Sequence, residues 1–375
     1  MENSNNTVFY KKERITSLDA LRAFTLLGIL IVHANNGFGF AYERVMSYWG
    51  SFWALFNDLF LSSKCNSIFA ALFGVSFYLI LRNPKNTSAK FVWRCILLAL
   101  IGLINKLFYS YDALMWYGIC GMALVMLRNL KTTYLLICCI SLVLISNYMA
   151  RFNMGDLLFG PTVGARYGAD KSFIDVLTYP NAVKDYLHIV INGGALGTLA
   201  KFIFGYWIAK IGFIEHLQER MTVRLLMITW VVFLVLLVVN YLVKVNGVDN
   251  NLITMLNNYS ASIAYASALL YAYYNCGYCN RILRLFEPYG KLGLTNYSIG
   301  GILGVIFINE FGMGLYKYPL TFIVLFFIVF FLVQAVFSYY WLRYFTYGPM
   351  EYVWRVATER KKIPFLRNQE TQLKA

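Results

Sequence analysis

The segment Arg22-Ala-Phe-Thr-Leu-Leu-Gly-Ile-Leu-Ile-Val-His33 decides how the chain folds, because it is almost entirely apolar between an arginine and a histidine. An α-helix turns about 100° per residue, so eleven steps place Arg22 and His33 on nearly the same face, about 16 Å apart. A charged side chain in hydrocarbon costs at least ~2.5 kcal/mol on insertion scales, so a membrane-buried arginine normally faces a bundle interior or a wet cavity. The face that carries Arg22 and His33 is therefore where we expect function.

The composition of the whole chain is that of a membrane protein. Its 375 residues are 59% hydrophobic and 14% charged, with a mean hydropathy of +0.56, whereas about 25% of the residues of soluble domains are charged. A cleavable signal peptide is not expected, because the polar residues 1–14 lead into an apolar run that ends at His33 and Asn35 without a small-residue cleavage pattern. The first span should therefore stay attached.

Ten apolar runs are long enough to be membrane helices, since about 20 residues cross the ~30 Å hydrocarbon core. The runs lie near residues 17–37, 63–82, 91–109, 112–129, 132–150, 187–210, 222–243, 252–275, 290–309 and 319–343. Short basic clusters between these runs carry much of the net charge of +15, as the positive-inside rule predicts. We expect an all-α, polytopic membrane bundle of about ten transmembrane helices with both termini cytoplasmic, and no nucleic-acid partner.

Three parts follow from this topology. Residues 1–16 are expected to form a cytoplasmic tail, residues 17–345 the transmembrane helical domain, and residues 346–375 a basic cytoplasmic tail. The longest loop outside the cytoplasm, residues 151–186, contains glycines that break long helices and tyrosines that can anchor it at the interface. This loop could cover the mouth of a cavity, or it could be a solvated connector.

His33 is the first candidate for chemistry. In the predicted topology it lies past the middle of the membrane, toward the outer leaflet. An imidazole titrates near neutral pH, so it can take a proton from an acceptor hydroxyl or amine, or carry an acyl group itself. The alternative is a histidine that only bonds to a neighbouring helix. The arginine on the same face, and Asn35 and Asn36 directly after it, favour a functional site.

Arg22 and Asp112 each allow two interpretations. The guanidinium of Arg22 offers five donors that suit a phosphate or a pantetheine carbonyl, but Arg22 could merely pair with Asp19, three residues before it. Asp112 opens the fourth predicted span soon after Lys106, so a structural ion pair explains it as well as catalysis does.

No metal site is expected from the sequence. There is no HExxH motif, and Cys276 and Cys279 have neither a second cysteine pair nor nearby histidines to complete a zinc site. The seven cysteines are an odd number and lie mostly in apolar runs, which disfavours a disulfide framework. No P-loop, GxGxxG or GxSxG motif occurs in a suitable setting, which disfavours nucleotide hydrolysis and a serine hydrolase.

Five segments carry a resemblance to a known family. They are Arg14-Ile-Thr-Ser-Leu-Asp-Ala-Leu-Arg-Ala-Phe-Thr-Leu-Leu-Gly-Ile-Leu30, residues 64–77, residues 94–112, Gly293-Leu-Thr-Asn-Tyr297 and Tyr347-Gly-Pro-Met-Glu-Tyr-Val-Trp-Arg355. In this order they resemble the motifs of the YeiB-like family of bacterial membrane proteins, within the wider transmembrane acyltransferase superfamily. The likeness covers most of the chain, with a YeiB-like C-terminal part at about 200–355, and is weakest in the loop 151–186.

The resemblance implies an enzyme that takes an acyl group from cytoplasmic acyl-CoA and transfers it to a carbohydrate or other acceptor across the membrane. In the related acyltransferase family three, activity requires an Arg-x10-His pattern in the first span, which corresponds here to Arg22 and His33. Many YeiB-like proteins have asparagine in place of His33, so catalysis is expected of this member rather than of the whole family. Ala23 stands where glycine is usual, and Asn105 where histidine is frequent, which argues against a mechanism with two histidines.

We therefore expect a multi-pass protein of the bacterial cytoplasmic (inner) membrane that transfers an acyl group, most simply acetyl, from acyl-CoA to an extracytoplasmic envelope glycan or glycolipid. The expected catalytic residues are His33, Arg22 and Asp112, and the expected acyl-CoA-binding residues are Arg22, Lys64 and Arg94. Membrane lipid and the envelope acceptor are the expected partners. Two alternatives stay open, a transporter or flippase for a small or lipid-linked envelope metabolite and a non-catalytic envelope-assembly protein, since both also need polar groups inside the membrane.

Overall fold

The computed structural model describes residues 15–41, 48–83, 86–108, 112–159, 167–168, 191–247 and 250–367. Helices account for most of these residues. In chain order they are α1 (Thr16–Asn35), α2 (Tyr48–Phe56), α3 (Lys64–Leu81), α4 (Ser88–Phe108), α5 (Leu114–Met126), α6 (Thr132–Arg151), α7 (Met154–Phe159), α10 (Gly194–Lys210), α11 (Leu217–Arg220), α12 (Val223–Val245), α13 (Asn251–Asn275), α14 (Gly277–Lys291), α15 (Gly293–Ile308), α16 (Leu320–Tyr344) and α17 (Pro349–Glu359). Two short strands, β1 (Phe40–Ala41) and β2 (Tyr167–Gly168), pair in parallel.

Six stretches of the described residues are helical, long and apolar enough to cross a membrane: α1, Tyr48–Leu81, Ser88–Lys106, α6, α12 and α16. Two bent helix pairs raise this number to as many as eight, namely α10 with residues 214–220, bent by 62°, and α14 with α15, bent by 77°. The fold is therefore that of an all-α, multi-pass membrane protein, as the sequence predicted. A described helix also falls within each of the ten predicted runs, but α5 has only 13 residues, so the count of about ten spans stays a prediction.

The long apolar stretch Tyr48–Leu81 is not one continuous α-helix. α2 continues into a π-helical turn, η2 (Asn57–Leu61), and α3 begins only after Ser63, whose φ is +65°. A left-handed backbone is uncommon at a residue with a side chain, and here it separates two helices. The N-terminus of α3 consequently lies within the apolar stretch rather than at its edge.

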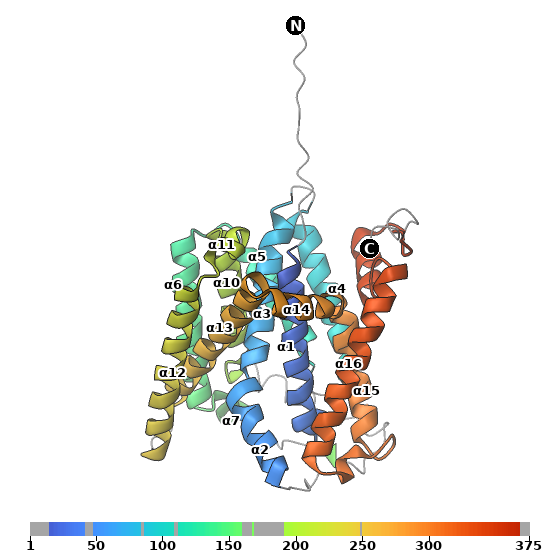
Figure 1. Cartoon of the computed structure of the whole chain (residues 1–375). Helices are drawn as coiled ribbons and strands as arrows, with labels where there is room; N and C mark the ends of the chain where they lie inside the picture. Colours follow the sequence, from blue (N-terminus) through green and yellow to red (C-terminus); the bar gives the residue numbers. More distant parts are fainter. Residues whose placement is uncertain are drawn as a thin grey trace.

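α1 is the central helix of the bundle (Figure 1). It packs against α3, α13, α14, α15 and α16, and most of its residues are buried. A helix that is buried on nearly all sides needs apolar or small residues on nearly all faces, as Leu21, Ala23 and Leu26 provide. α12 is the opposite case: it packs mainly against α13 and leaves side chains such as Val231 and Val235 exposed, as lipid contact requires.

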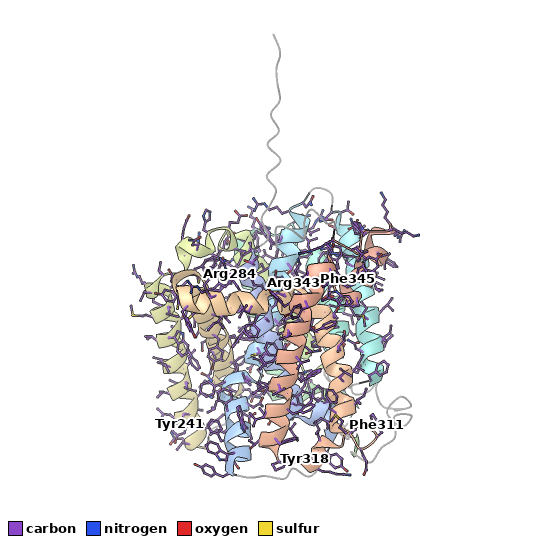
Figure 2. The ribbon with its side chains drawn as sticks, turned by 45° about the vertical axis from the view of Figure 1, so that its right-hand side comes forward. Tyr241, Arg284, Phe311, Tyr318, Arg343 and Phe345 are labelled. Atoms are coloured by element: carbon purple, nitrogen blue, oxygen red, sulfur yellow. The ribbon has the colours of Figure 1, made fainter. Side chains whose placement is uncertain are left out.

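The two ends of the bundle differ in the residues that they carry. Figure 2 shows Arg284 and Arg343 toward one end, and Tyr241, Phe311 and Tyr318 at the other. The end with the arginines also holds α11 and the C-terminal helix (Figure 1). This asymmetry fits the predicted orientation, in which the basic end faces the cytoplasm.

The structure describes only part of the predicted outer loop and of the predicted C-terminal tail. In the predicted loop 151–186, residues 160–166 and 169–186 lie outside the described part of the chain, so the roles considered for this loop stay predictions. The predicted tail 346–375 begins with α17, which packs against α4 and α15. The first part of this tail thus belongs to the folded domain, whereas residues 368–375, like residues 1–14, lie outside the described residues.

We expect reporters fused at Leu217 and at Gly247 to lie on opposite sides of the membrane. Leu217 is in α11, beside basic residues, and Gly247 follows the far end of α12 (Figure 1), so the first fusion should be cytoplasmic and the second outside. Paired phosphatase and fluorescent-protein fusions in whole cells would measure this, with a fusion after Glu359 as a second cytoplasmic point. The same side for Leu217 and Gly247 would show that α12 does not span.

Candidate functional site

His33 lies in the last turn of α1, beside two aromatic rings. The ring of Phe38 stands edge-on to the imidazole at 5.8 Å between centroids, and the ring of Tyr297 at 6.4 Å. Phe38 is fully buried with a φ of +49°, and Gly304 of α15 leaves space for its ring, because a Cβ there would overlap it. The turn after α1 therefore helps to fix the position of the imidazole.

His33 lines a cavity of about 230 Å³ between α1, α3, α5 and α15, which we call the His33 cavity. Its polar side chains come from His33, Asn36, Ser63, Asn66, Tyr117 and Tyr297. Apolar side chains such as Ile29 and Phe69, together with Cys65, form the rest of the wall. A few polar groups converging in an apolar cavity is the usual arrangement of a small-molecule site. The helix face that the sequence singled out thus meets a cavity at its His33 end.

Two helices begin at the wall of the His33 cavity. Ser63, Cys65 and Asn66 at the start of α3 line it, and so do Ala113 and Leu114 at the start of α5. Helix N-termini carry a partial positive charge, which attracts anions and stabilises negative charge that develops in a reaction. The break at Ser63 therefore has a chemical consequence, because it brings the positive end of α3 to the cavity.

Tyr117 and Asn66 form a direct contact in the wall of the His33 cavity. The hydroxyl of Tyr117 in α5 donates a hydrogen bond of 2.8 Å to the Oδ1 atom of Asn66 in α3, and Tyr117 is buried. Tyr117 is absent from the predicted site, because a tyrosine within an apolar helix is ordinary and gives no signal by itself. Asn66 and Tyr297 do carry a signal, since both lie in segments that resemble the family's motifs.

Asp112 is buried directly behind the wall of the His33 cavity. Its Oδ2 atom accepts a 3.0 Å hydrogen bond from the N–H of Leu114, which caps the start of α5. Its Oδ1 atom lies 3.4 Å from Nδ2 of Asn105, which also donates a 2.9 Å bond to Ser298 in α15. Next to it, the N–H of Ala113 donates to the hydroxyl of Tyr297 at 3.1 Å. Asp112 does not line the cavity itself. Its hydrogen bonds instead hold the start of α5 in place beside the cavity.

Arg22 and Arg94 make contacts away from the His33 cavity. Arg22 forms an ion pair of 2.5 Å with Asp19 and donates a 2.9 Å hydrogen bond to Ser76 in α3. The guanidinium of Arg94 lies 4.6 Å from the ring centre of Trp354, whose indole N–H donates to the carbonyl oxygen of Arg94. Arg94 thereby attaches α4 to α17. The predicted acyl-CoA contacts of both arginines stay predictions.

Lys64 is nearer to the site. Its ammonium group is buried and donates a 2.7 Å hydrogen bond to the carbonyl oxygen of Asp58 in η2, which joins the two sides of the helix break. The next two residues, Cys65 and Asn66, line the His33 cavity. Of the five predicted site residues, His33 alone lines the cavity, and Asp112 and Lys64 adjoin it. Within the described part of the chain, no cluster of three His, Cys, Asp or Glu residues is suited to a metal.

The two C-terminal motifs found in the sequence meet at the start of α15. Glu351 in α17 accepts hydrogen bonds from the backbone N–H groups of Leu294 and Thr295, at 2.8 and 3.1 Å, and from the hydroxyl of Thr295. Its carboxylate thus caps the N-terminus of α15 from another helix. Because α15 carries Tyr297, which lines the His33 cavity, this contact also helps to set the position of the cavity wall.

Replacing Glu351 with alanine is expected to lower the free energy of unfolding by about 1–3 kcal/mol, because two backbone donors and a hydroxyl lose their acceptor. Thermal unfolding of the purified protein in detergent would measure the change. The control is Glu359→Ala on the same helix, which removes a partly exposed ion pair with Lys90 and should cost less than ~1 kcal/mol. Equal effects of the two variants would contradict a capping role.

Glu351 should also make stability depend on pH. Burial raises the pKa of its carboxyl above the ordinary 4.5, although its hydrogen bonds oppose this. A raised pKa in the folded state gives stability that is full below pH 4.5 and is lost as the pH rises through the raised value. As the pH rises from 4.5 through the raised pKa, the free energy of unfolding of the parent should therefore fall relative to that of Glu351→Gln. The same dependence of unfolding free energy on pH in both proteins would contradict this.

Comparisons with known proteins support the resemblance to the YeiB-like family. Residues 208–361 match a family described as "Protein of unknown function (DUF418)". The chain is 26% identical to an "Uncharacterized 39.9 kDa protein in amylase 3'region" of Bacillus acidopullulyticus, over 96% of this chain and 97% of that protein. It is 27% identical to the "Uncharacterized protein YxaH" of Bacillus subtilis, over 92% and 94%. No solved structure matches the chain. The family match runs from the end of α10 to α17, and so includes Tyr297, whereas α1, α3 and α5 of the His33 cavity precede it.

Proposed function

We propose that the chain is an acyl-CoA-dependent acyltransferase of the bacterial cytoplasmic membrane, which transfers an acyl group, most simply acetyl, to an envelope glycan or glycolipid. The observation that carries this proposal is the presence of a histidine in a cavity where two helices begin. Acyl transfer needs a base that takes the proton of the acceptor, and positive potential near the carbonyl oxygen on which negative charge develops. The cavity has a volume of about 230 Å³, which is below the roughly 300–1,000 Å³ of most ligand pockets. It could therefore hold the acyl end of the donor but not the whole acyl-CoA molecule.

In the direct form of the reaction, His33 takes the proton from the acceptor hydroxyl as its oxygen attacks the thioester carbonyl carbon. The C–S bond then breaks, and the imidazolium returns the proton to the leaving thiolate of CoA. Negative charge develops on the carbonyl oxygen, where the N-termini of α3 and α5 would stabilise it. In the covalent form, a ring nitrogen of His33 attacks the thioester carbonyl carbon, the C–S bond breaks, and CoA leaves as the thiol with the proton of the imidazole. The acceptor hydroxyl then attacks the acyl-imidazole, the C–N bond breaks, and the proton of the hydroxyl returns to the imidazole.

The proposal is tested by supplying acetyl-CoA, labelled in its acetyl group, to one side of proteoliposomes that contain the full chain and an envelope extract. Acyl transfer predicts label in a glycan or glycolipid fraction and release of one free thiol for each label transferred. Proteoliposomes without the protein provide the background. Label that stays in acetyl-CoA in the presence of a complete envelope extract would contradict the proposal.

Arg22 would orient the CoA moiety from the cytoplasmic half of α1. Its guanidinium already holds two groups at once, Asp19 and Ser76, so it can exchange one partner for a phosphate or carbonyl oxygen. Arg22→Lys is expected to weaken CoA binding, because an ammonium cannot reproduce a forked contact. Calorimetric titration with CoA would measure this, with Arg82→Lys, an exposed arginine, as the control. Equal affinity in the Arg22 variant and the parent would make Arg22 a structural partner of Asp19.

A transporter or flippase is the second candidate, because one observation favours it. The long apolar stretch Tyr48–Leu81 is broken at Ser63, next to a polar cavity, and discontinuous membrane helices whose N-termini point at a site are common in transporters. A transporter would move its substrate chemically unchanged. The thiol released in the proteoliposome assay therefore separates the two functions.

A further inference from the structure

A second, larger cavity of about 530 Å³ lies between α3, α6, α10, α12 and α13, and it shares no lining residue with the His33 cavity. Its volume is within the roughly 300–1,000 Å³ of small-molecule sites. Most of its lining side chains are apolar. We call it the Lys201 cavity, after the one charged residue among the described residues that line it.

Lys201 is an unusual residue to find in this wall. It belongs to α10 and is partly buried, and its ammonium nitrogen lies 5.7 Å from the ring centre of Tyr259 in α13. No described aspartate or glutamate lines the cavity or forms an ion pair with Lys201. A cation among apolar membrane helices is costly unless an anion or water accompanies it. The ring of Tyr259 provides part of this compensation, and an anionic ligand would provide more.

The charged part and the wholly apolar part of the lining occupy different ends of the Lys201 cavity, and the hydroxyls of Thr229 and Ser267, which bond to each other at 2.8 Å, also line it. Lys201, Tyr259, Ser67 and Ser262 form one end. The hydroxyls of both serines already donate to backbone carbonyl oxygens four residues earlier in the chain, those of Ser63 and Asn258. The other end, beyond the C-terminus of α10, is lined by apolar side chains: Ile211, Phe213, Ile214, Leu217, Met221 and Leu225. Ile211 is ten residues after Lys201 along α10, so the two ends are about 15 Å apart at about 1.5 Å of helix rise per residue.

We propose that the Lys201 cavity binds a hydrocarbon chain with an anionic head group, with the head at Lys201 and the chain along α10 toward residues 211–225. A single cation at one end and walls that are mostly apolar elsewhere match a long-chain carboxylate or a single-chain phosphate lipid. The two sources share this chemistry. The inference is independent of the proposed acyl transfer, because it uses a different cavity and different residues.

The experiment measures binding of radiolabelled palmitate at pH 7 to the full chain in an uncharged detergent. Lys201→Gln is expected to raise the Kd at least about tenfold, because it removes the charge but keeps a polar side chain of similar length. The matched control is Lys210→Gln on the same helix, whose ammonium donates to the carbonyl oxygens of Arg128 and Leu130 outside the cavity. The control should bind palmitate like the parent.

Competition in the parent protein tests the same point without a mutation. Hexadecanol has the chain but no charge, so it should compete at least tenfold less well than unlabelled palmitate. A single-chain lysophosphatidate distinguishes the sources: stronger competition than palmitate would indicate a phosphate head group, and weaker competition a carboxylate. Ala266→Trp, which fills the apolar part, should abolish binding. Equal binding by parent and Lys201→Gln, or equal competition by the alcohol, would overturn the proposal.

Discussion

Asparagine in place of His33 is expected to lower acyl transfer by at least ~10²-fold in a protein that remains folded. Asparagine can replace a hydrogen bond of the imidazole, but it cannot take up a proton near neutral pH or carry an acyl group. The surrounding rings of Phe38 and Tyr297 and the turn after α1 would be retained. A catalytic His33 therefore predicts a stable, inactive variant, and His33→Ala should be equally inactive.

The measurement compares acyl transfer in proteoliposomes with thermal unfolding in detergent for each variant. His216→Asn is the matched control, because it makes the same change at an exposed histidine outside the His33 cavity. It should leave both transfer and stability unchanged. Normal transfer by a stably folded His33→Asn protein would remove His33 from the mechanism and make the transporter the first candidate.

The helices and the polar surroundings of one face of α1 could be predicted from the sequence, because both depend on local properties. Apolar runs with few charges must form helices in a membrane, since lipid offers no partner for a free backbone amide. The cost of burying Arg22 and the spacing to His33 indicated which side of α1 faces polar groups. The structure has Arg22 bonded to Asp19 and Ser76, and His33 in a cavity.

The rest of the site depends on pairs of residues that are distant in sequence. Glu351 caps a helix that begins more than 50 positions earlier, and Tyr117 bonds to Asn66 from another helix. Nothing near these residues specifies the partner. The start of the second span was predicted well, since the apolar run was placed near residues 63–82 and α3 begins at Lys64. The left-handed backbone of Ser63 could not be predicted, because no glycine or proline marks it.

The contact between α3 and α10 is expected to be destabilised by one added carbon at either of two glycines. A Cβ on Gly74 of α3 would overlap the carbonyl oxygen of Phe202, and a Cβ on Gly205 of α10 would overlap the carbonyl oxygen of Ala71. Both obstacles are backbone atoms, which cannot rotate away as a side chain can. Small residues let membrane helices approach this closely. Gly74→Ala and Gly205→Ala should therefore each cost about 1–3 kcal/mol or more, which is the effect of overpacking.

The double variant Gly74→Ala/Gly205→Ala should be the most damaging, because α3 and α10 would have to separate along their shared face. Folded yield after detergent extraction and thermal unfolding would measure the loss. Gly277→Ala is the control: a Cβ there would meet no atom within 4 Å, so its effect should stay within about 0.5 kcal/mol. Since α3 contributes to both cavities and α10 carries Lys201, the single variants should also weaken palmitate binding. If the Gly74→Ala and Gly205→Ala variants were as stable as Gly277→Ala, α3 and α10 would not be in close contact at these glycines.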